Sequence, residues 1–417
     1  MVVANWAIWS ISALTAAGVI SRAFNLSQAA WAVAGATALV CLGLLPASNA
    51  LEGVGKGVDV YLFLIGMMLL AEVARVTGLF DWLAAEAAAH AHGSARRLFD
   101  LVYLVGILVT VFLSNDATAV VLTPAVAAVV RAAKLSHPLP YLLICAFIAN
   151  AASFVLPISN PANLVIYAEH MPPLAQWLPR FALPSILAIA ATYGVLRWTQ
   201  RAALRETVPA TVEAPRLTFS AKAAAAGIGI TAVILMGASA MGWQLGLPTC
   251  VAGLVTLAVV SALERSAPWP YLRELSWGVI PLVAGLFVLV EGLAQSGAIE
   301  ALSGALRHGA GGSQTLTAGA SGVLIGFLCN LVNNLPAGLV AGTAVHSANV
   351  PASVASSVLI GVDVGPNLSV TGSLATILWL TALRREGIHV KALDFLKLGC
   401  WVMPPALLLA LAAVVWA

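Results

Sequence analysis

The chain has 417 residues, of which 61% are hydrophobic and only 9% are charged. Soluble domains usually have about 25% charged residues, so this composition excludes a soluble globular protein and predicts a polytopic protein embedded in a lipid bilayer. The formal net charge of +3 gives no reason to expect a nucleic-acid partner, and in a membrane protein the placement of charges matters more than their sum.

A helix needs about 20 predominantly apolar residues to cross the hydrocarbon core. Stretches of about this length lie near 4–21, 27–46, 58–77, 178–196, 223–242, 246–263, 275–295 and 395–416. The first has no basic residue before it and no small-residue cleavage site after it, so we expect a retained helix and not a signal peptide. Two more crossings must contain the Gly-, Pro- and Asn-rich breaks near residues 156 and 368.

The same pattern occurs twice along the chain, 219 positions apart. Glu72, Thr77, Gly78, Leu79 and Asp81 recur as Glu291, Ser296, Gly297, Ala298 and Glu300, and Ser114 and Asn115 recur as Asn333 and Asn334. We therefore predict two repeats, 1–199 and 221–417, joined by an exposed cytoplasmic linker over 200–220. We expect the linker to act as a tether.

The basic residues indicate how the repeats cross the membrane. If the segments around Ser114 and Asn333 are re-entrant hairpins, each repeat crosses five times and the second is inverted. With the linker in the cytoplasm, only Lys56, Arg180 and Arg307 lie outside, as the positive-inside rule favours. The predicted fold is all-α, with an inverted-topology repeat, two re-entrant hairpins and two broken transmembrane helices. The first hairpin opens inward and the second outward.

Two polar segments interrupt apolar runs in the first repeat. The first hairpin tip contains Ser114, Asn115, Asp116 and Thr118, and the break that follows contains Ser159, Asn160 and Asn163 between and after two prolines. Helix ends and unwound turns at such places expose backbone groups that bind polar ligands. Asp116 is costly inside a membrane, and burial without a cation favours its protonated form.

The second repeat contains corresponding segments. Its hairpin tip has Asn333 and Asn334, and its break contains Asp363, Asn367, Thr371 and Ser373. At the 219-residue offset Leu335 stands opposite Asp116, so the two acids are not related by that offset. We predict that Asp116 and Asp363 bind the coupling protons and that the Ser, Thr and Asn side chains of the four segments bind the substrate around one central site.

Several other polar residues are expected to be structural. The five cysteines show no metal-binding spacing, so we expect buried thiols and neither a metal nor a cofactor. Glu72 and Glu291 are expected to pair with a neighbouring backbone or hydroxyl group. The histidines at helix ends and loops are expected to be surface groups: His90, His92, His308, His346 and His389.

At its polar segments the chain resembles the ArsB-type arsenite efflux pumps of the ion transporter superfamily. The likeness lies in FLSNDATAVVLTP (112–124), NAASFVLPISNPANLVI (150–166), LVNNLPAGLVAG (331–342) and IGVDVGPNLSVTGSLATILWL (360–380). The dicarboxylate/sodium symporters of the same superfamily have Ser-Asn-Thr at both tips. Here Asp116 and Leu335 stand where their Thr would be, which argues against a sodium site of that type.

The resemblance implies a secondary transporter of the bacterial inner membrane that expels arsenite and antimonite in exchange for protons. It also implies, as an option, a soluble arsenite-stimulated ATPase as a cytoplasmic partner. The alternative is a sodium/proton antiporter of the related NhaD type, which also needs carboxylates. An intramembrane hydrolase is disfavoured, because the chain has neither a G-x-S-x-G nor an H-E-x-x-H motif.

Overall fold

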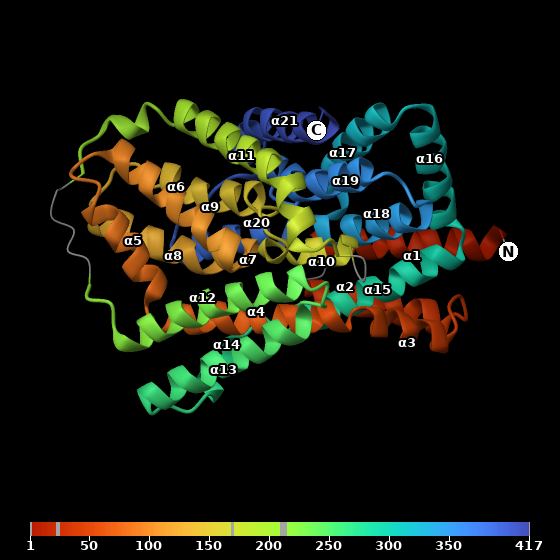
Figure 1. Cartoon of the computed structure of the whole chain (residues 1–417), viewed down its shortest axis with the longest axis horizontal. Coiled ribbons are helices and arrows are strands. Elements are labelled where there is room, and N and C mark those ends of the chain that lie inside the picture. The colour runs from red at the N-terminus through yellow and green to blue at the C-terminus, as the bar shows by residue number, and fades with distance from the viewer. Residues whose placement is uncertain (1, 22–25, 168–170, 209–214, 417) are drawn as a thin grey trace.

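The computed structural model describes residues 2–21, 26–167, 171–208 and 215–416, and they form a bundle of helices (Figure 1). Six of the helices are long and apolar enough to cross a membrane, and there are eight if two bent pairs count as one span each. Five predicted stretches match helices closely: α1 (Val2–Ser21), α4 (Val58–Val76), α12 (Phe219–Ala240), α13 (Gly246–Glu264) and α21 (Ala392–Trp416). The composition therefore predicted the class of fold correctly.

Two predicted spans are shorter in the structure than in the sequence analysis. The stretch 27–46 forms α2 (Gln28–Cys41), which ends before Gly43 because that residue has a left-handed φ of +67°. The stretch 275–295 forms α15 (Val279–Gln295), which begins after a turn in which the Trp277 amide donates to the Leu275 carbonyl. Hydropathy alone does not detect such turns.

The inverted repeat is present in the order of the helices. In the first repeat α4 is followed by α5 (Leu79–Ala89), hairpin 1, α9 (Leu139–Ala151), α10 (Pro161–Tyr167) and α11 (Leu174–Thr199). In the second, α15 is followed by α16 (Ala298–Gly312), hairpin 2, α19 (Ala352–Val364), α20 (Leu374–Arg385) and α21. Gly78 and Gly297 make the equivalent bends, with φ of +77° and +80°.

Both re-entrant hairpins form as predicted. Hairpin 1 consists of α6 (Ala95–Phe112), a short α7 (Asn115–Ala117), a π-helical segment over 118–122 and α8 (Thr123–Ala132). Hairpin 2 consists of α17 (Gln314–Val332) and α18 (Asn334–Ala348). Short 3₁₀ turns at Pro157–Ser159 and Gly365–Leu368 mark the two broken helices. Each break therefore lies between two helices of its own repeat.

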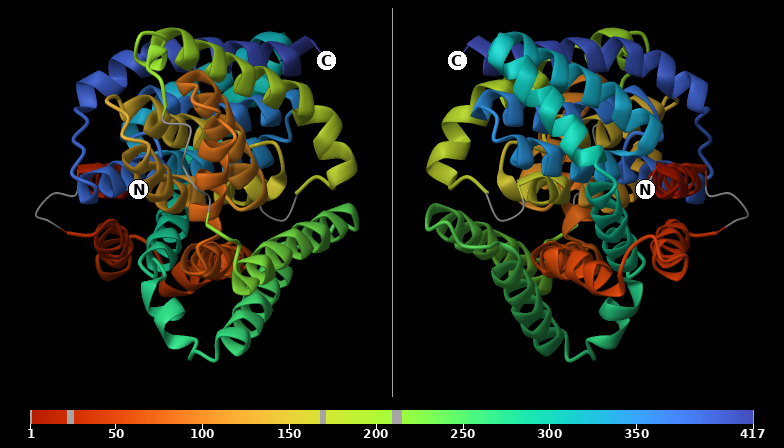
Figure 2. Two further views of the ribbon diagram at one scale, coloured as in Figure 1. Left: turned by 90° about the vertical axis from the view of Figure 1, so that its left-hand side faces the viewer. Right: turned by 90° about the vertical axis from the view of Figure 1, so that its right-hand side faces the viewer.

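The repeats pack against each other crosswise. In the outer part α2 lies along α15 and α13 along α4, so each repeat covers the other. In the inner part α10 packs along α18 of hairpin 2, and α20 packs against the return leg of hairpin 1. Figure 2 shows α12 and α13, in green, projecting from the body of the molecule. The remaining helices α3 (Ala47–Lys56) and α14 (Trp269–Glu274) are short.

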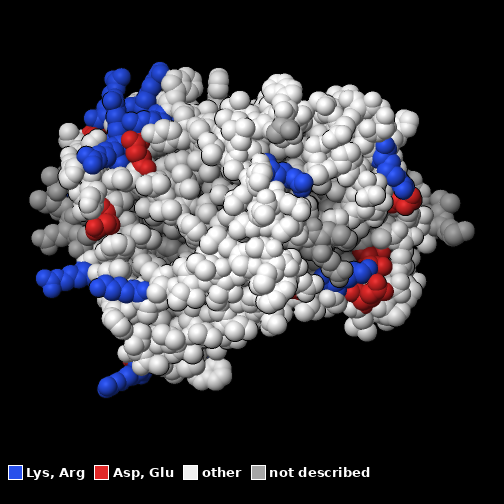
Figure 3. All heavy atoms as spheres, viewed as in Figure 1, with Lys and Arg blue, Asp and Glu red and all other residues white. Residues whose placement is uncertain are grey.

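Charged side chains lie mainly at the two ends of the molecule. Figure 3 shows Lys and Arg gathered at the left-hand end, where Figure 1 places α5 and the beginning of α12. There Arg131 of hairpin 1 pairs with Glu386 after α20, and Arg197 of α11 pairs with Asp100 of α6. These pairs join elements across the cytoplasmic end that the positive-inside rule predicts.

The expectation for Glu72 and Glu291 was wrong, because both carboxylates pair with cations. Glu72 accepts two hydrogen bonds from Arg75, at 2.5 and 2.8 Å. Glu291 accepts from Lys56 at 2.9 Å, and this pair joins the end of α3 to α15. Arg75 follows Glu72 by one helical turn, but no basic residue stands at the equivalent position after Glu291. Glu291 therefore pairs with Lys56 of the other repeat. The equivalent of Thr77, Ser296, accepts from the Trp9 indole at 2.8 Å.

The linker is attached to hairpin 1 before it reaches α12. The Val208 amide donates to the Gly93 carbonyl at 2.9 Å. The Glu206 carboxylate accepts from the amides of Ser136 and His137, at 3.1 and 3.4 Å. The linker therefore connects the cytoplasmic base of hairpin 1 to the outer helices of the second repeat.

Thiol labelling can test the orientation of the two repeats. Ala210, which the sequence analysis predicts to be cytoplasmic, lies outside the described residues, so we choose the exposed Arg216 nearby. A cysteine in place of Arg216 should react with an impermeant thiol reagent only from the cytoplasm, and one in place of the exposed Gly311 only from outside. Reaction of both from one side would contradict the inverted repeat.

Candidate functional site

Most polar side chains at the tip of hairpin 1 hold the tip in shape. Ser114 caps α7 by accepting from the Ala117 amide at 3.2 Å, and Asn115 Oδ1 accepts from the Asp116 amide at 2.9 Å. Thr118 is hydrogen-bonded to Thr110 of α6 at 2.8 Å, which joins the two legs of the hairpin. Three of the predicted binding residues therefore define the position of the fourth polar residue, Asp116.

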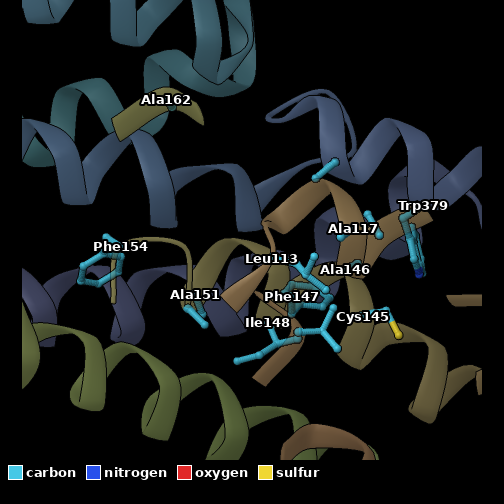
Figure 4. Close-up of a cluster of buried hydrophobic side chains, with 14 of the residues drawn as sticks. Leu113, Ala117, Cys145, Ala146, Phe147, Ile148, Ala151, Phe154, Ala162 and Trp379 are labelled. Atoms are coloured by element: carbon cyan, nitrogen blue, oxygen red, sulfur yellow. The ribbon is translucent and has the colours of Figure 1, made fainter. Parts of the chain in front are cut away.

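Asp116 is the unpaired group of this tip. Its side chain is only partly buried, and within the described chain no Lys or Arg pairs with it and no hydrogen bond reaches its carboxyl group. Figure 4 shows apolar side chains of this tip packed on the next helix: Leu113 and Ala117 lie beside Ala146 and Phe147 of α9. An ionised carboxyl without a cation partner is costly inside a membrane.

The break in the first repeat is attached to this hairpin. Ser159 is fully buried, and its hydroxyl donates to the Val111 carbonyl of α6 at 3.0 Å. Asn163 Nδ2 donates to the Ser153 carbonyl at 2.9 Å, which ties α10 to the unwound segment before it. Asn160 Oδ1 accepts from the Ala162 amide at 3.0 Å and so begins α10. The two prolines force this unwinding, since neither can continue a helix without freeing a carbonyl.

The tip of hairpin 2 is attached to the break of the second repeat in a similar way. Asn333 has a left-handed φ of +73° and donates from Nδ2 to the Thr371 carbonyl at 3.2 Å. The Asn334 amide donates to the Gly372 carbonyl at 2.9 Å. Thr371 in turn donates to the Asn330 carbonyl at 2.9 Å. Ser373 caps α20 by accepting from the Thr376 amide at 3.1 Å.

Hydrogen bonds between the two breaks connect the repeats. Asn160 Nδ2 donates to Asp363 Oδ1 at 2.6 Å. Asn150 Nδ2 donates to Asn367 Oδ1 at 3.0 Å and to Thr376 Oγ1 at 3.3 Å. All these side chains are at least 98% buried. A continuous chain of contacts thus runs from hairpin 1 through both breaks to hairpin 2.

Asp363 has an equivalent that the sequence analysis did not find. Asn150 is the last residue but one of α9, and Asp363 is the last but one of α19. Asn160 and Ser373 cap the helices that follow, and both pairs are 213 positions apart. The repeat therefore has an amide and a carboxyl at equivalent places. Asn150 and Thr376 belong to the network although neither was predicted as a site residue.

Three buried oxygens in this network have no hydrogen-bond partner within the described residues: Asn163 Oδ1, Asn334 Oδ1 and Asp363 Oδ2. Ser153 lies beside Asp363, but its hydroxyl donates to the Asn150 carbonyl at 2.7 Å. A buried acceptor without a donor costs about 1–3 kcal/mol. These atoms therefore fit a ligand that donates hydrogen bonds, or a cation.

The site offers no positive charge to an anion. No Lys or Arg pairs with Asp116 or Asp363 in the described part of the chain. Cys329 lies near Asp363, and Cys145 lies near Thr123 of hairpin 1; both thiols are fully buried, as expected. The expectation of buried thiols was wrong for Cys41 and Cys400, which are exposed on α2 and α21. A cavity of about 540 Å³ between α1, α15 and hairpin 2 is almost entirely apolar and is lined by none of the predicted site residues.

Comparison with known proteins places this architecture in a family. The family model of the citrate transporters, CitMHS, matches residues 7–362. The chain belongs to the citrate transporter family. It is a membrane transporter and a multi-pass protein of the bacterial inner membrane.

Relatives of this citrate transporter family member include arsenical pump membrane proteins. The arsenical pump membrane proteins of Yersinia enterocolitica and Escherichia coli K12 are 28% and 27% identical to it over 365 residues, which is 84% of each chain. The resemblance to ArsB-type pumps is thereby confirmed. An uncharacterized transporter of Mycobacterium tuberculosis is 25% identical and covers 97% of the chain.

The fold of this family member also occurs in a solved structure. The YdaH transporter of Alcanivorax borkumensis aligns with a TM-score of 0.57 at 17% identity, over 88% of this chain and 87% of its own. The topology of that transporter is described as unusual. At this identity the likeness concerns the fold alone.

Substitution of Asn150 tests the network between the breaks. Asn150→Ala removes the donor from Asn367 and Thr376 and should lower stability by about 1–3 kcal/mol. Asn150→Asp should lower it more at neutral pH, because a buried carboxylate then faces the Asn367 acceptor. The deficit of Asn150→Asp should shrink at acid pH, where the protonated carboxyl can donate. Thermal unfolding in detergent measures the loss of stability in both variants. A loss in Asn150→Asp that is the same at all pH values would contradict the network.

Proposed function

We propose that the protein expels arsenite and antimonite from the cytoplasm in exchange for protons, by alternating access of one central site. The observation that supports this most directly is the set of buried acceptors at the breaks, Asn163 Oδ1, Asn334 Oδ1 and Asp363 Oδ2. The arsenical pump relatives supply the substrate class.

Trivalent arsenic suits such a site because its hydroxide is neutral in water at physiological pH and donates hydrogen bonds. Amide and carboxyl oxygens accept these bonds without requiring a counter-charge. The remaining predicted side chains, such as Ser159 and Thr371, fix the backbone around the site. Buried thiols bind soft metalloids strongly, but a transporter must release its cargo in each cycle, so the substrate should depend on oxygen partners more than on Cys329.

Citrate itself fits the site poorly. A tricarboxylate would bring negative charges against acceptor oxygens and two acids, and no Lys or Arg among the described residues is paired to those acids. Burying unpaired charge of one sign is strongly unfavourable. The family name therefore indicates the fold of this protein and not its substrate. The polar network favours a substrate without charge.

A neutral cargo must be driven by a coupled ion. One elementary charge moving down 100 mV releases about 2.3 kcal/mol, which is more than the roughly 1.4 kcal/mol needed for a tenfold gradient of neutral solute. Asp116 and Asp363 are the two acids that can bind the proton in exchange for the substrate. A soluble ATPase could add to this force by docking on the cytoplasmic end.

The decisive experiment is arsenite uptake into inverted membrane vesicles with an imposed pH gradient. An acidic lumen should drive arsenite inward, and a protonophore should abolish the uptake. The wild-type protein should also make the lumen more alkaline only when arsenite is supplied, because protons leave the lumen as arsenite enters. Uptake that ignores the gradient would contradict proton exchange.

A sodium/proton antiporter is the second candidate, since the same unpartnered oxygens could hold a small hard cation. The absence of a hydroxyl at the Asp116 and Leu335 positions speaks against it. Proton flux that depends on sodium and not on arsenite, measured in the same vesicles, would favour this candidate instead.

A further inference from the structure

Helices α10 and α19 pack side by side and carry polar groups at matching intervals. Asn160 and Tyr167 are seven residues apart, as are Asp363 and Ser356. Seven residues make two helical turns, about 10.5 Å along the axis, so Ser356 and Asp363 lie on one face of α19. Asn160 immediately precedes α10, and Tyr167 is its last residue. Asn160 donates to Asp363 at 2.6 Å, and Tyr167 lies beside Ser356. The interface therefore has two polar contacts, two turns apart.

The polar atoms between these contacts are buried but incompletely bonded. Asp363 Oδ2, Asn163 Oδ1 and the Tyr167 hydroxyl have no hydrogen-bond partner within the described residues. Asn163 lies on the same face of α10 as Tyr167, one turn before it. Buried polar atoms of this kind are usually satisfied by internal water, each molecule making about three hydrogen bonds. The interface can thus hold a line of water and hydroxyl groups.

This line leads from the central site toward the outer end of the molecule. Cβ atoms on Gly338 and Gly342 of α18 would meet Ile166 of α10, and the Ile166 carbonyl is hydrogen-bonded to His346 Nε2 at 2.8 Å. His346 is in the last turn of α18, at the open base of hairpin 2, which the charge distribution places outside. Contrary to the sequence analysis, His346 is therefore not a surface group. It is half-buried against α10.

The groups around the line come from five helices. Cys329 of α17 and Asn160, which immediately precedes α10, face Asp363. Tyr167 faces Ser356 of α19 and Arg180 of α11, and its ring lies 6.4 Å from that of His346.

The inner side of the repeat does not have this line. At the 213-residue offset, Ser356 corresponds to Leu143 and Tyr167 corresponds to Leu380. Trp379, which is fully buried, closes this region by donating to the Leu142 carbonyl at 2.8 Å. The polar interface is therefore a feature of the outer side alone, although the backbone around it is duplicated.

We propose that the α10–α19 interface is a proton path between the outside and Asp363, with Tyr167 at its outer end. This inference rests on the proposed function for its direction, since an efflux antiporter must take up protons from outside. A proton enters at the Tyr167 end, each hydroxyl or water accepts one proton and passes on another, and the Asp363 carboxylate accepts the last.

Removal of the Tyr167 hydroxyl tests the path in transport. Tyr167→Phe should slow arsenite uptake driven by an acidic lumen at least about fivefold, which corresponds to roughly 1 kcal/mol in barrier height. Arsenite-for-arsenite exchange without a gradient should be unchanged, because it moves no proton. The control Tyr141→Phe loses an equally buried ring hydroxyl, one that donates to the Ala95 carbonyl at 3.2 Å near the cytoplasmic base of hairpin 1, and should keep both rates. Gradient-driven uptake by Tyr167→Phe at the wild-type rate would overturn the path.

The protonation rate of Asp363 tests the path without any transport. In the reconstituted protein, the infrared band of the protonated carboxyl that Asp363→Asn lacks should grow after a drop of the outside pH. Its growth should be at least about fivefold slower in Tyr167→Phe than in the wild type, whereas the control Tyr141→Phe should keep the wild-type rate. Equal rates in the wild type and Tyr167→Phe would overturn the path. If the wild type shows no gradient-driven arsenite uptake, the proposed function fails, and the infrared rates still decide whether the path exists.

Discussion

Asp363→Asn is expected to abolish arsenite accumulation driven by a pH gradient, with a loss of at least about a hundredfold in rate, or roughly 2.7 kcal/mol in barrier height. The new amide oxygen can still accept from Asn160, so the contact between the two breaks is retained. The amide cannot exchange a proton in the physiological range. The variant should therefore bind arsenite and exchange it across the membrane without accumulating it. Counterflow and gradient-driven uptake in inverted vesicles measure the two activities separately.

Asp116→Asn is the matched comparison, because Asp116 is the other acid at a break. It is only partly buried and has no hydrogen-bond partner in the described chain, whereas Asp363 is buried and bonded to the other repeat. If both acids bind coupling protons, both variants lose accumulation and keep exchange. Full accumulation by Asp363→Asn together with loss in Asp116→Asn would assign the coupling to the hairpin tip. Full accumulation by both would remove proton coupling from these acids.

Gly361→Val is expected to prevent folding. Helices α17 and α19 approach each other through Gly322 and Gly326 on one side and Gly361 and Gly365 on the other, a spacing of small residues that lets membrane helices touch. A Cβ on Gly361 would lie 2.2 Å from the Gly322 carbonyl oxygen, and one on Gly365 would lie 2.3 Å from that of Gly326. Backbone cannot rotate away as a side chain can, so the cost should reach or exceed the roughly 3 kcal/mol of severe overpacking.

Gly319→Val on α17 is the control for this substitution. A Cβ there meets no atom within 4 Å, and Val is a slightly better helix former than Gly. The level of folded protein in membranes and its unfolding temperature in detergent should be normal for Gly319→Val and greatly reduced for Gly361→Val. Normal folding of Gly361→Val would mean that α17 and α19 are not in backbone contact.

The places of the hairpins and breaks could be predicted from sequence because each one interrupts a long apolar run. Polar residues such as Asn115 and Asn334, or prolines such as Pro157, are rare within membrane spans unless the backbone leaves the helix there. The partners of these residues could not be predicted. Asn160 pairs with Asp363, and Asn150 with Asn367, across more than 200 residues of sequence.

The equivalence of Asn150 and Asp363 was missed for a specific reason. The return leg of hairpin 1 covers 115–132 and that of hairpin 2 only 334–348, which is three residues shorter. The loop between α8 and α9 covers 133–138 and that between α18 and α19 only 349–351, which is three residues shorter again. The spacing of the repeats therefore changes from 219 at the hairpin tips to 213 at the broken helices. A comparison at one constant offset sets Asp363 beside the wrong residue. Local patterns determine where helices end, but differences in the lengths of the return legs and loops alter the correspondence between duplicated elements.

The crosswise packing of the repeats constrains how the protein can be made. During synthesis α4 leaves the ribosome long before α13, the helix that covers it, and hairpin 1 precedes α20 in the same way. The first 199 residues made alone would leave these faces uncovered in the bilayer and should be removed by membrane proteases. Two separately encoded halves should instead protect each other when they are produced together. Each repeat thus covers helix faces that the other repeat would leave exposed. An ancestral single copy would have covered these faces by pairing with a second, oppositely inserted molecule.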